Sequence, residues 1–294
     1  MTRRIGINPI GWSNDDLSEL GGDIPLEQCL REAKAAGYAG VELGNKFPRQ
    51  ALALRPILEA HGLVLVSGWY STFLLERDAE AEFVAAAAHR QLLREMGCKL
   101  LIAAECAGTV HGDRARPLSS RPVLDESQWP LFRQRLTRFA EMLAAEGLTL
   151  VYHHHMGTVV QTGAEIDRLM RETGPAVGLL LDTGHATWAG ADPAVLARAW
   201  RPRIAHVHTK DVRAGIAALA GRGDWSFLDA VIAGVYTVPG DGCIDFAAVL
   251  AELLDYSGWI VVEAEQDPKK APPAAYARKG FVHLANILST RGVS

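Results

Sequence analysis

The sequence predicts an α/β fold, a (β/α)8 barrel that covers residues 1–294 as a single domain. Short apolar runs of strand type alternate eight times with longer stretches of helical periodicity. The runs are apolar on both faces, as in a parallel sheet, and eight such units fit the roughly 250 residues of a barrel. No linker or change in composition divides the chain.

The expected strands are short and mostly aliphatic, and each is followed by an expected helix. The strands cover residues 5–12, 40–47, 63–70, 99–106, 148–155, 177–185, 204–212 and 259–266. The helices cover residues 26–36, 49–60, 80–95, 126–145, 165–172, 193–200, 246–256 and 274–289. Six glycines stand where a helix gives way to the next strand, a place that favours a left-handed C-terminal cap: Gly37, Gly62, Gly97, Gly147, Gly174 and Gly258. An open doubly wound sheet is the alternative, but no Gly-x-Gly-x-x-Gly follows the first strand.

Composition argues against several classes of partner. The 30 Lys and Arg residues face 34 Asp and Glu residues, a net charge of −4, so no basic excess favours nucleic acid or an anionic membrane. No apolar run approaches the ~20 residues that cross a bilayer, and no signal-peptide pattern opens the chain. The four scattered cysteines form no Cys-x-x-Cys pair. We therefore expect a cytoplasmic protein with reduced thiols and a small-molecule partner.

Polar residues gather at the carboxyl ends of the later strands, where (β/α)8 barrels place their catalytic groups. Six of the ten histidines lie there: His153, His154, His155, His185, His206 and His208. Acidic and basic residues lie at the same ends: Asp182, Lys210, Asp211, Glu263 and Glu265. A single histidine at a strand end is more often structural, but this group has no packing rationale.

Alternation along a strand decides which of these residues share a face. His153 and His155 point to one side, and so do the pairs His206 with His208 and Glu263 with Glu265. Mixed nitrogen and oxygen ligands suit a divalent transition metal such as Mn, Co or Zn. The sequence predicts one metal ion, held by His153, Asp182, His208 and Glu263. The spacing leaves open whether His155 replaces His153 and whether Glu265 replaces Glu263.

These motifs resemble a known superfamily. LDTGH (181–185), AHVHTKD (205–211), PGDG (239–242) and GWIVVE (258–263) are similar to segments of the xylose isomerase-like TIM barrels, which include sugar isomerases, epimerases and dehydratases. The resemblance implies that Asp182, His208 and Glu263 bind the metal and that His185 touches substrate. The fifth strand departs from the pattern, because YHHHMGT (152–158) stands where a ligand glutamate is usual.

A narrower resemblance covers both ends of the chain. GINPIGWSNDD (6–16), GGD (21–23), VELGNKFPR (41–49), MGT (156–158) and EAEQDP (263–268) resemble the inosose dehydratase family. That resemblance implies a hydro-lyase of myo-inositol catabolism, which dehydrates scyllo-inosose (2-keto-myo-inositol) to a trihydroxycyclohexane dione. It also implies Mn or Co as the metal.

Such a dehydration needs a base beside the ketone and an acid for the departing hydroxyl. His155 and Lys210 are favoured as the base, and His185 or Glu265 as the acid. Other polar and aromatic residues at strand ends are expected to bind the polyol: Asn8, Trp12, Glu42, Lys46, Trp69 and Glu105. Trp12 and Trp69 fit the core equally well.

Two long connections, residues 107–125 and 213–242, are expected to form lids or subunit contacts. Two other functions compete with dehydration. A ketose epimerase or isomerase would use the same barrel, but the carboxylate of the fifth strand is missing. A sugar-binding protein without activity has no reason to keep a full ligand set. A homo-oligomer is compatible with the sequence.

Overall fold

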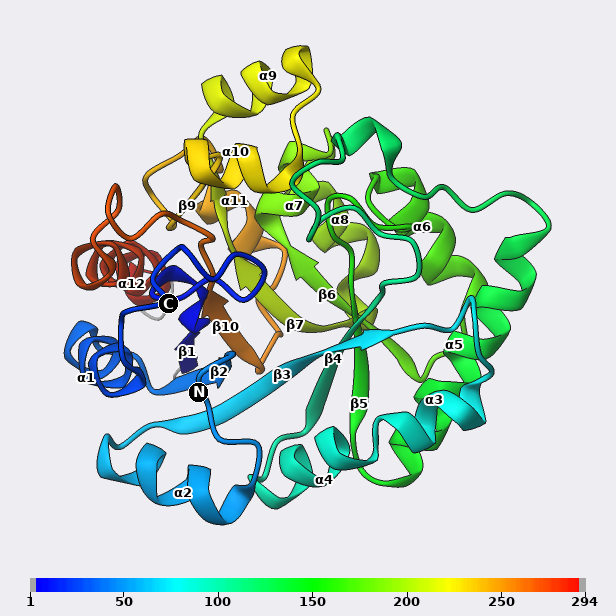
Figure 1. Cartoon of the computed structure of the whole chain (residues 1–294), viewed down its shortest axis with the longest axis horizontal. Coiled ribbons are helices and arrows are strands. Elements are labelled where there is room, and N and C mark those ends of the chain that lie inside the picture. The colour runs from blue at the N-terminus through cyan, green and yellow to red at the C-terminus, as the bar shows by residue number, and fades with distance from the viewer. Residues whose placement is uncertain (1–3, 291–294) are drawn as a thin grey trace.

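The computed structural model describes residues 4–290 and contains the expected parallel barrel (Figure 1). Residues 1–3 and 291–294, the ends of the single domain expected over 1–294, lie outside the described residues. Eight strands close the barrel in the order β1-β10-β7-β6-β5-β4-β3-β2. They are β1 (Arg4–Ile7), β2 (Gly40–Leu43), β3 (Val64–Thr72), β4 (Leu100–Glu105), β5 (Thr149–His153), β6 (Val177–Asp182), β7 (Ile204–Thr209) and β10 (Trp259–Val262).

Helices surround the barrel, mostly where the periodicity predicts them. They are α1 (Leu26–Ala36), α2 (Ala51–Ala60), α3 (Ala79–Ala85), α4 (Ala87–Glu95), α5 (Gln128–Ala145), α6 (Gly163–Glu172), α7 (Thr183–Trp188), α8 (Pro193–Trp200), α9 (Ala214–Gly223), α10 (Phe227–Ala233), α11 (Phe246–Ala251) and α12 (Pro273–Thr290). Short 3-10 helices cover Pro9–Gly11, Leu118–Ser120 and Arg201–Arg203. The single helix expected over 80–95 is two helices, α3 and α4, which meet at Ala86.

Local sequence explains where these elements begin and end. Helix α6 starts with a capping box, in which the Thr162 hydroxyl and the Glu165 carboxylate satisfy backbone N–H groups at its first turn. Four of the six expected glycine caps have a positive φ: Gly37, Gly62, Gly97 and Gly147. Gly174 and Gly258 do not, so the expected left-handed cap is wrong at those two positions.

Strand register brings the functional ends together. Asp182 at the end of β6 pairs with His208 of β7, and Val262 of β10 pairs with Thr209 of β7. Because parallel neighbours end at the same edge, the polar residues of β5, β6, β7 and β10 meet at one mouth. Below them, Ile102, Val151 and Leu180 pack together as an apolar layer.

The connection after β7 departs from the expected strand. β7 ends at Thr209, and Asp211–Val212 form a separate strand, β8, which pairs antiparallel with β9 (Tyr236–Thr237). The carboxylate of Asp211 accepts hydrogen bonds from the N–H groups of Gly240, Gly242 and Ile244. Asp211 therefore shapes the turn after β9 and is not part of the polar group at the mouth.

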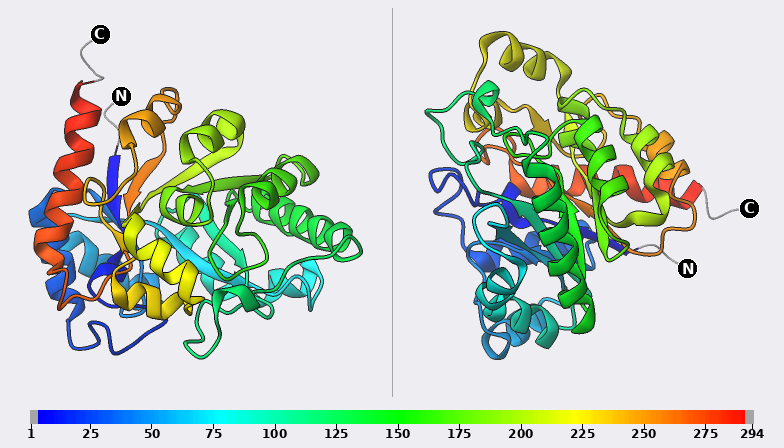
Figure 2. Two further views of the ribbon diagram at one scale, coloured as in Figure 1. Left: turned by 90° about the horizontal axis from the view of Figure 1, so that it is seen from above. Right: turned by 90° about the vertical axis from the view of Figure 1, so that its right-hand side faces the viewer.

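The two long connections meet over the mouth of the barrel. In the left view of Figure 2, α9 and α10 and the connection after β4 lie at the end opposite the start of β1. The amide of Leu118 donates to the carbonyl of Trp225 (3.1 Å), and Arg114 pairs with Asp229 (2.6 Å). The two segments thus hold each other in place. Within the described residues, no helix is both long and apolar enough to cross a bilayer.

Candidate metal centre and active site

Four buried side chains form one compact group at the mouth of the barrel. One ligand atom from each of them lies within 4.8 Å of the others: His153, Asp182, His208 and Glu263. They come from the ends of β5, β6 and β7 and from the residue that follows β10. This is the set predicted for the metal, and the structure groups it without His155 or Glu265.

Hydrogen bonds on the outer side of the group decide which atoms face inward. Nδ1 of His153 donates to the carbonyl of His154 (2.7 Å), which leaves Nε2 facing Oδ2 of Asp182 at 3.5 Å. Asp182 is the N-cap of α7, and its Oδ1 accepts the amide N–H of His185 (2.8 Å). Nδ1 of His208 contacts the carboxylate of Glu263. Each residue therefore keeps one donor atom directed at a shared point.

The donor set fits a divalent cation. Oδ2 of Asp182, Nδ1 of His208 and Oε2 of Glu263 are buried, contact one another and His153, and have no hydrogen-bond partner outside the group among the described residues. Buried polar atoms are nearly always satisfied, so three orphaned atoms in one group point to a missing partner. Two imidazole nitrogens and two carboxylates are the ligand types of Mn, Co and Zn.

Glu42 lies behind His208 and belongs to the support of the group. Its carboxylate accepts from Nε2 of His206 (2.7 Å), the hydroxyl of Ser67 (2.6 Å) and the amide of Asn8 (2.8 Å). Nε2 of His208 lies 3.1 Å away. Burial alone would raise the pKa of Glu42, but His208 and His206 hold it well below its usual range. The carboxylate is therefore charged.

A second buried group adjoins the first and contains the predicted acid and base residues. Nζ of Lys210 lies 2.6 Å from Oε1 of Glu265, 2.8 Å from Oε1 of Glu263 and 2.9 Å from Nε2 of His185. Nε2 of His155 lies 4.0 Å from Oε1 of Glu265. Lys210 thus connects the two groups through Glu263.

The environment sets different protonation states in this second group. Burial lowers the pKa of His155 well below its usual value, and His111 adds to the effect. Burial also opposes charge on Lys210, but Glu263 and Glu265 outweigh it and raise the pKa of the ammonium. Burial raises the pKa of Glu265 to about 7, although Lys210 acts against it. His155 is thus a neutral ring, Lys210 an ammonium and Glu265 a carboxyl that titrates near neutrality.

A cavity opens beside both groups, and the loops after β1 and β4 contribute to its wall. Its wall contains the predicted residues Asn8, Glu42 and Trp69, together with His153, His155, His208, Glu263 and Glu265. The Trp69 ring lies edge-on to those of His153 and His155, at 5.4 and 5.8 Å between centroids. Asn8 and Trp69 therefore stand where a bound polyol would touch them.

Three residues predicted to bind substrate lie outside the wall of the cavity, in contrast to the prediction. The indole N–H of Trp12 donates to Glu32 (2.6 Å), and the ring is buried in the core. Nζ of Lys46 donates to the carbonyls of Gly21 and Gly22. Neither residue is part of the cavity wall.

Glu105 is the third predicted substrate-binding residue that lies outside the cavity wall. It ends β4 on the face opposite Ile102, which lines the cavity, so alternation directs its carboxylate outward. There it accepts the amide N–H groups of Leu74 (2.7 Å) and Ala107 (3.2 Å). Glu105 therefore joins the loops after β3 and β4 and does not meet substrate.

Several residues near the site were not predicted from the sequence. His111, from the connection after β4, lines the cavity with its ring 5.1 Å from that of His155. Asp15, Asp16 and Ser71 complete the wall. The hydroxyl of Tyr236 of β9 lies within hydrogen-bond distance of Nδ1 of His185 (2.8 Å). No periodicity marks His111, Asp15 and Asp16, which lie in loops, or Tyr236, whose strand is too short to show alternation, whereas Ser71 lies in β3, one residue beyond the expected strand 63–70.

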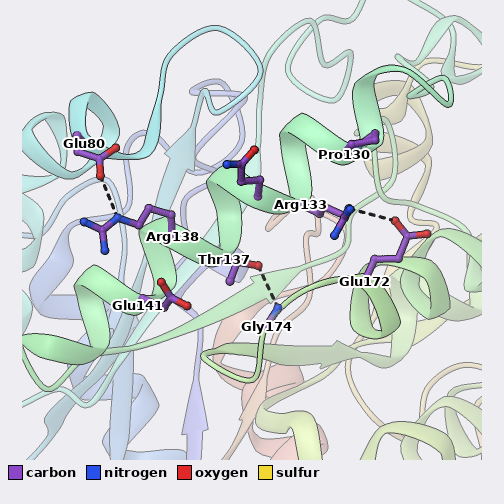
Figure 3. Close-up of a pocket in the computed structure, with 9 residues that line it drawn as sticks. Glu80, Pro130, Arg133, Thr137, Arg138, Glu141, Glu172 and Gly174 are labelled. Atoms are coloured by element: carbon purple, nitrogen blue, oxygen red, sulfur yellow. Dashed lines mark hydrogen bonds and ion pairs between the residues drawn. The ribbon is translucent and has the colours of Figure 1, made fainter.

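A wider hollow lies on the outside of the barrel, against α5 (Figure 3). Its charged side chains pair with one another, as in Arg138 with Glu80 (2.9 Å) and Arg133 with Glu172 (3.8 Å). The Thr137 hydroxyl accepts from the amide of Gly174 (3.0 Å). Among the described residues, none of the groups of metal-ligand type lies in this hollow, so the barrel mouth is the candidate active site.

Comparison with known proteins places the chain in a family. The model of the xylose isomerase-like TIM barrel family matches residues 30–287. The rhizopine catabolism protein MocC of Rhizobium meliloti is 49% identical over 99% of this chain and 90% of its own length. An inosose dehydratase of Geobacillus thermodenitrificans is 48% identical over 96% of both chains.

Solved structures resemble the chain in fold. The IolI protein, in a crystal structure with a zinc atom, has a TM-score of 0.68 at 16% identity and covers 98% of both chains. The probable 3-DHS dehydratase AsbF of Bacillus anthracis has a TM-score of 0.70 at 14% identity, over 96% of this chain and 98% of its own. At such identities the likeness concerns the barrel alone.

Proposed function

The chain belongs to the xylose isomerase-like TIM barrel family, and we propose that it is a metal-dependent inosose dehydratase. In this proposal it removes water from scyllo-inosose, the 2-ketone of myo-inositol, and yields a trihydroxycyclohexane dione. The observation that carries the proposal is the pairing of two buried groups beside one cavity: a set of side chains of metal-ligand type next to an acid and a base. The inosose dehydratase at 48% identity over nearly the whole chain supports the choice of substrate.

We propose that His153, Asp182, His208 and Glu263 hold one divalent ion, Mn²⁺ or Co²⁺. When bound, such an ion supplies Lewis-acid polarisation of the substrate ketone and makes the neighbouring C–H more acidic. Asn8 and Trp69 orient the polyol against this group, one by a hydrogen bond and the other by the face and edge of its ring.

His155 is the proposed base. Its Nδ1 donates to the carbonyl of Met156 (2.7 Å), so the neutral ring presents the lone pair of Nε2. The ring is part of the cavity wall, and its pKa is depressed by burial. Lys210, the other base candidate, is an ammonium held between two carboxylates. His155 is therefore the group that accepts the proton from the carbon beside the ketone.

Glu265 is the proposed acid. Its carboxyl lines the cavity, and Oε2 is buried with no hydrogen-bond partner among the described residues. With its pKa raised to about 7, the protonated form is available at neutral pH. Glu265 donates this proton to the hydroxyl on the next carbon, so the C–O bond breaks and water leaves. The enol that remains tautomerises to the dione.

The arrangement of carboxylates favours elimination over epimerisation. The functional carboxylates of the cavity, Glu263 and Glu265, both follow β10, and β5 contributes imidazoles only. The fifth strand therefore offers no glutamate to an epimerase that needs one there.

The test is turnover of scyllo-inosose, followed by ultraviolet absorbance of the product. Metal-stripped protein is assayed with and without added Mn²⁺ or Co²⁺, beside Asp182→Ala. We expect dione to form only with metal and to be lost in the variant. Binding of metal without any dione from scyllo-inosose would overturn the proposal.

Two variants test the acid and base separately. His155→Gln and Glu265→Gln are expected to lower kcat by about 10² to 10⁴ while metal content stays at the wild-type level. Glu141→Gln, in the outer groove, is the matched control and is expected to leave kcat unchanged. Wild-type kcat in either site variant would remove that residue from the proposed chemistry.

A further inference from the structure

We infer that His111, from the connection after β4, binds a hydroxyl group on the part of the substrate ring that lies away from the proposed metal ligands. The inference rests on the proposed function, because it adds a contact for the same polyol in the same cavity. His111 lines this cavity, but it belongs neither to the group of four ligands nor to the second group that holds the proposed acid and base. It is a further substrate-binding residue.

The ring of His111 carries hydrogen-bonding capacity that the protein leaves unused. Its Nδ1 is buried with no hydrogen-bond partner among the described residues. In contrast, His153 and His155 each donate from Nδ1 to a backbone carbonyl at 2.7 Å. The ring of His111 is half-buried and lines the cavity, which leaves Nε2 as the nitrogen that a ligand can reach. Because an unpaired polar group in a buried place is costly, this position calls for a partner from outside the chain.

Three aromatic side chains hold the ring of His111 in place. Its centroid lies 5.1 Å from that of His155, 6.4 Å from that of Trp69 and 6.5 Å from that of Phe227, each in an edge-on arrangement. Such contacts orient a ring without a hydrogen bond to its nitrogen atoms. A side chain that is already held in one orientation loses little freedom when it binds a ligand.

The backbone of His111 is fixed to the loop after β5. The amide N–H of Val110 donates to the carbonyl of Gly157 (3.0 Å), and the Val110 side chain is fully buried. Gly157 has a φ of +81°, and a Cβ there would lie 3.0 Å from the amide nitrogen of His111. Glycine meets both demands because it has no Cβ. The loop that follows the proposed base His155 therefore also sets the position of His111.

The order of the rings along the wall indicates which part of the substrate His111 meets. His153, a proposed metal ligand, lies 5.5 Å from His155, and His155 lies 5.1 Å from His111, between ring centroids. The proposed base comes between the ligand and His111 in this series. A substrate whose ketone faces the ligands and whose acidic C–H faces His155 therefore presents the next part of its ring to His111. The hydroxyl groups there can donate or accept, so they can bond to Nε2 whether or not it carries a hydrogen.

The variants His111→Phe and His111→Gln test the inference. Phenylalanine keeps a ring among the three aromatic side chains but has no nitrogen, whereas glutamine keeps a polar end near the place of Nε2. We expect His111→Phe to raise KM for scyllo-inosose roughly three- to tenfold, the loss of one hydrogen bond, with kcat and metal content close to the wild-type values. His111→Gln should recover most of the lost binding, which a purely structural role of the ring does not predict.

His283→Phe is the matched control. The ring of His283 is also half-buried and edge-on to a phenylalanine ring, that of Phe246 (5.9 Å), but it lies outside the cavity wall. We expect this variant to have the KM and kcat of the wild type. A thermal melt of each variant verifies that it is folded.

Three outcomes would overturn the inference: an unchanged KM in His111→Phe, an equal rise of KM in His283→Phe, or a rise of KM in His111→Gln as large as that in His111→Phe. Failure of the proposed function is distinguishable, because the wild type would then form no dione. Calorimetric titration of scyllo-inosose into the same metal-loaded proteins would still decide the inference. Weaker binding in His111→Phe than in the wild type and His283→Phe would support it, and equal or absent binding in all of them would overturn it.

Discussion

His208 is held between two carboxylates, with Nε2 3.1 Å from Glu42 on one side of its ring and Nδ1 against Glu263 on the other. With a metal held by this group, Glu42 would be the outer carboxylate of a carboxylate–histidine–metal triad, which fixes the tautomer and raises the basicity of the ligand nitrogen. Because Glu42 accepts the hydrogen of Nε2, Nδ1 is the atom that offers a lone pair to the metal.

Glu42→Gln is therefore expected to weaken metal binding without removing a ligand. The amide is neutral and cannot accept from all the donors that surround it, so we expect metal affinity to fall about 10- to 100-fold. Competition with a chromophoric chelator measures the change. Glu82→Gln, a buried carboxylate paired with Arg77 outside the site, is the control and should bind metal as the wild type does. An unchanged affinity in Glu42→Gln would contradict the triad.

We predict one metal ion per chain, although a second group of ligand type that shares no residue with the first lies beside it. The second group, His155, His185 and Glu265, already contacts a cation of the protein itself. Nζ of Lys210 lies within 2.9 Å of His185 and Glu265. Elemental analysis of purified, metal-saturated protein should give a ratio near one. Lys210→Ala removes that cation, and its ratio should rise toward two; two ions per wild-type chain would contradict the prediction.

The sequence predicts those site residues that lie in strands, because side chains alternate between the two faces of a strand. His153 and Asp182 could be placed at one mouth because each ends a strand with clear alternation, and the register of β6 and β7 sets Asp182 beside His208. The same rule would have turned Glu105 away from the cavity, since Ile102 lies on the opposite face of β4.

Other positions depend on the path of a loop, which periodicity does not describe. Lys46 was expected at the mouth, but its ammonium donates hydrogen bonds to the carbonyls of Gly21 and Gly22 in the loop after β1. His111 and Tyr236 reach the site from long connections whose course is set by contacts between the two segments, such as Arg114 with Asp229. Those contacts have no local signature.

Removal of the metal should destabilise the fold. Without a cation, the carboxylates of Asp182 and Glu263 lie buried with unsatisfied oxygens, which is costly. A metal at 100 times its Kd is expected to add about 2.7 kcal/mol to the free energy of unfolding. Thermal melts with a chelator and after addition of Mn²⁺ measure this gain. Asp182→Asn, which retains the shape of the site, should lose most of the response; a full response in that variant would argue that the ion binds elsewhere.

His89 gives the protein a dependence of stability on pH that is separate from the site. Its ring lies 5.7 Å from that of Tyr70, and Nε2 is 3.3 Å from the carbonyl of Gly68. Burial lowers the pKa of His89 from 6.5 to about 4 in the folded protein. The unfolded chain therefore takes up a proton at higher pH than the folded one does, and stability is lost as the pH falls from about 6.5 toward 4.

Between pH 7 and pH 5 this linkage amounts to about 2 kcal/mol. His89→Gln cannot take up the proton, so its stability should fall less than that of the wild type over the same interval, by that amount. Urea unfolding of both proteins at the two pH values measures the difference. An identical pH dependence in the variant, or an NMR titration of His89 with a midpoint near 6.5, would contradict this prediction. Either result would show that the folded protein tolerates the charged ring and that any loss of stability in acid comes from other groups.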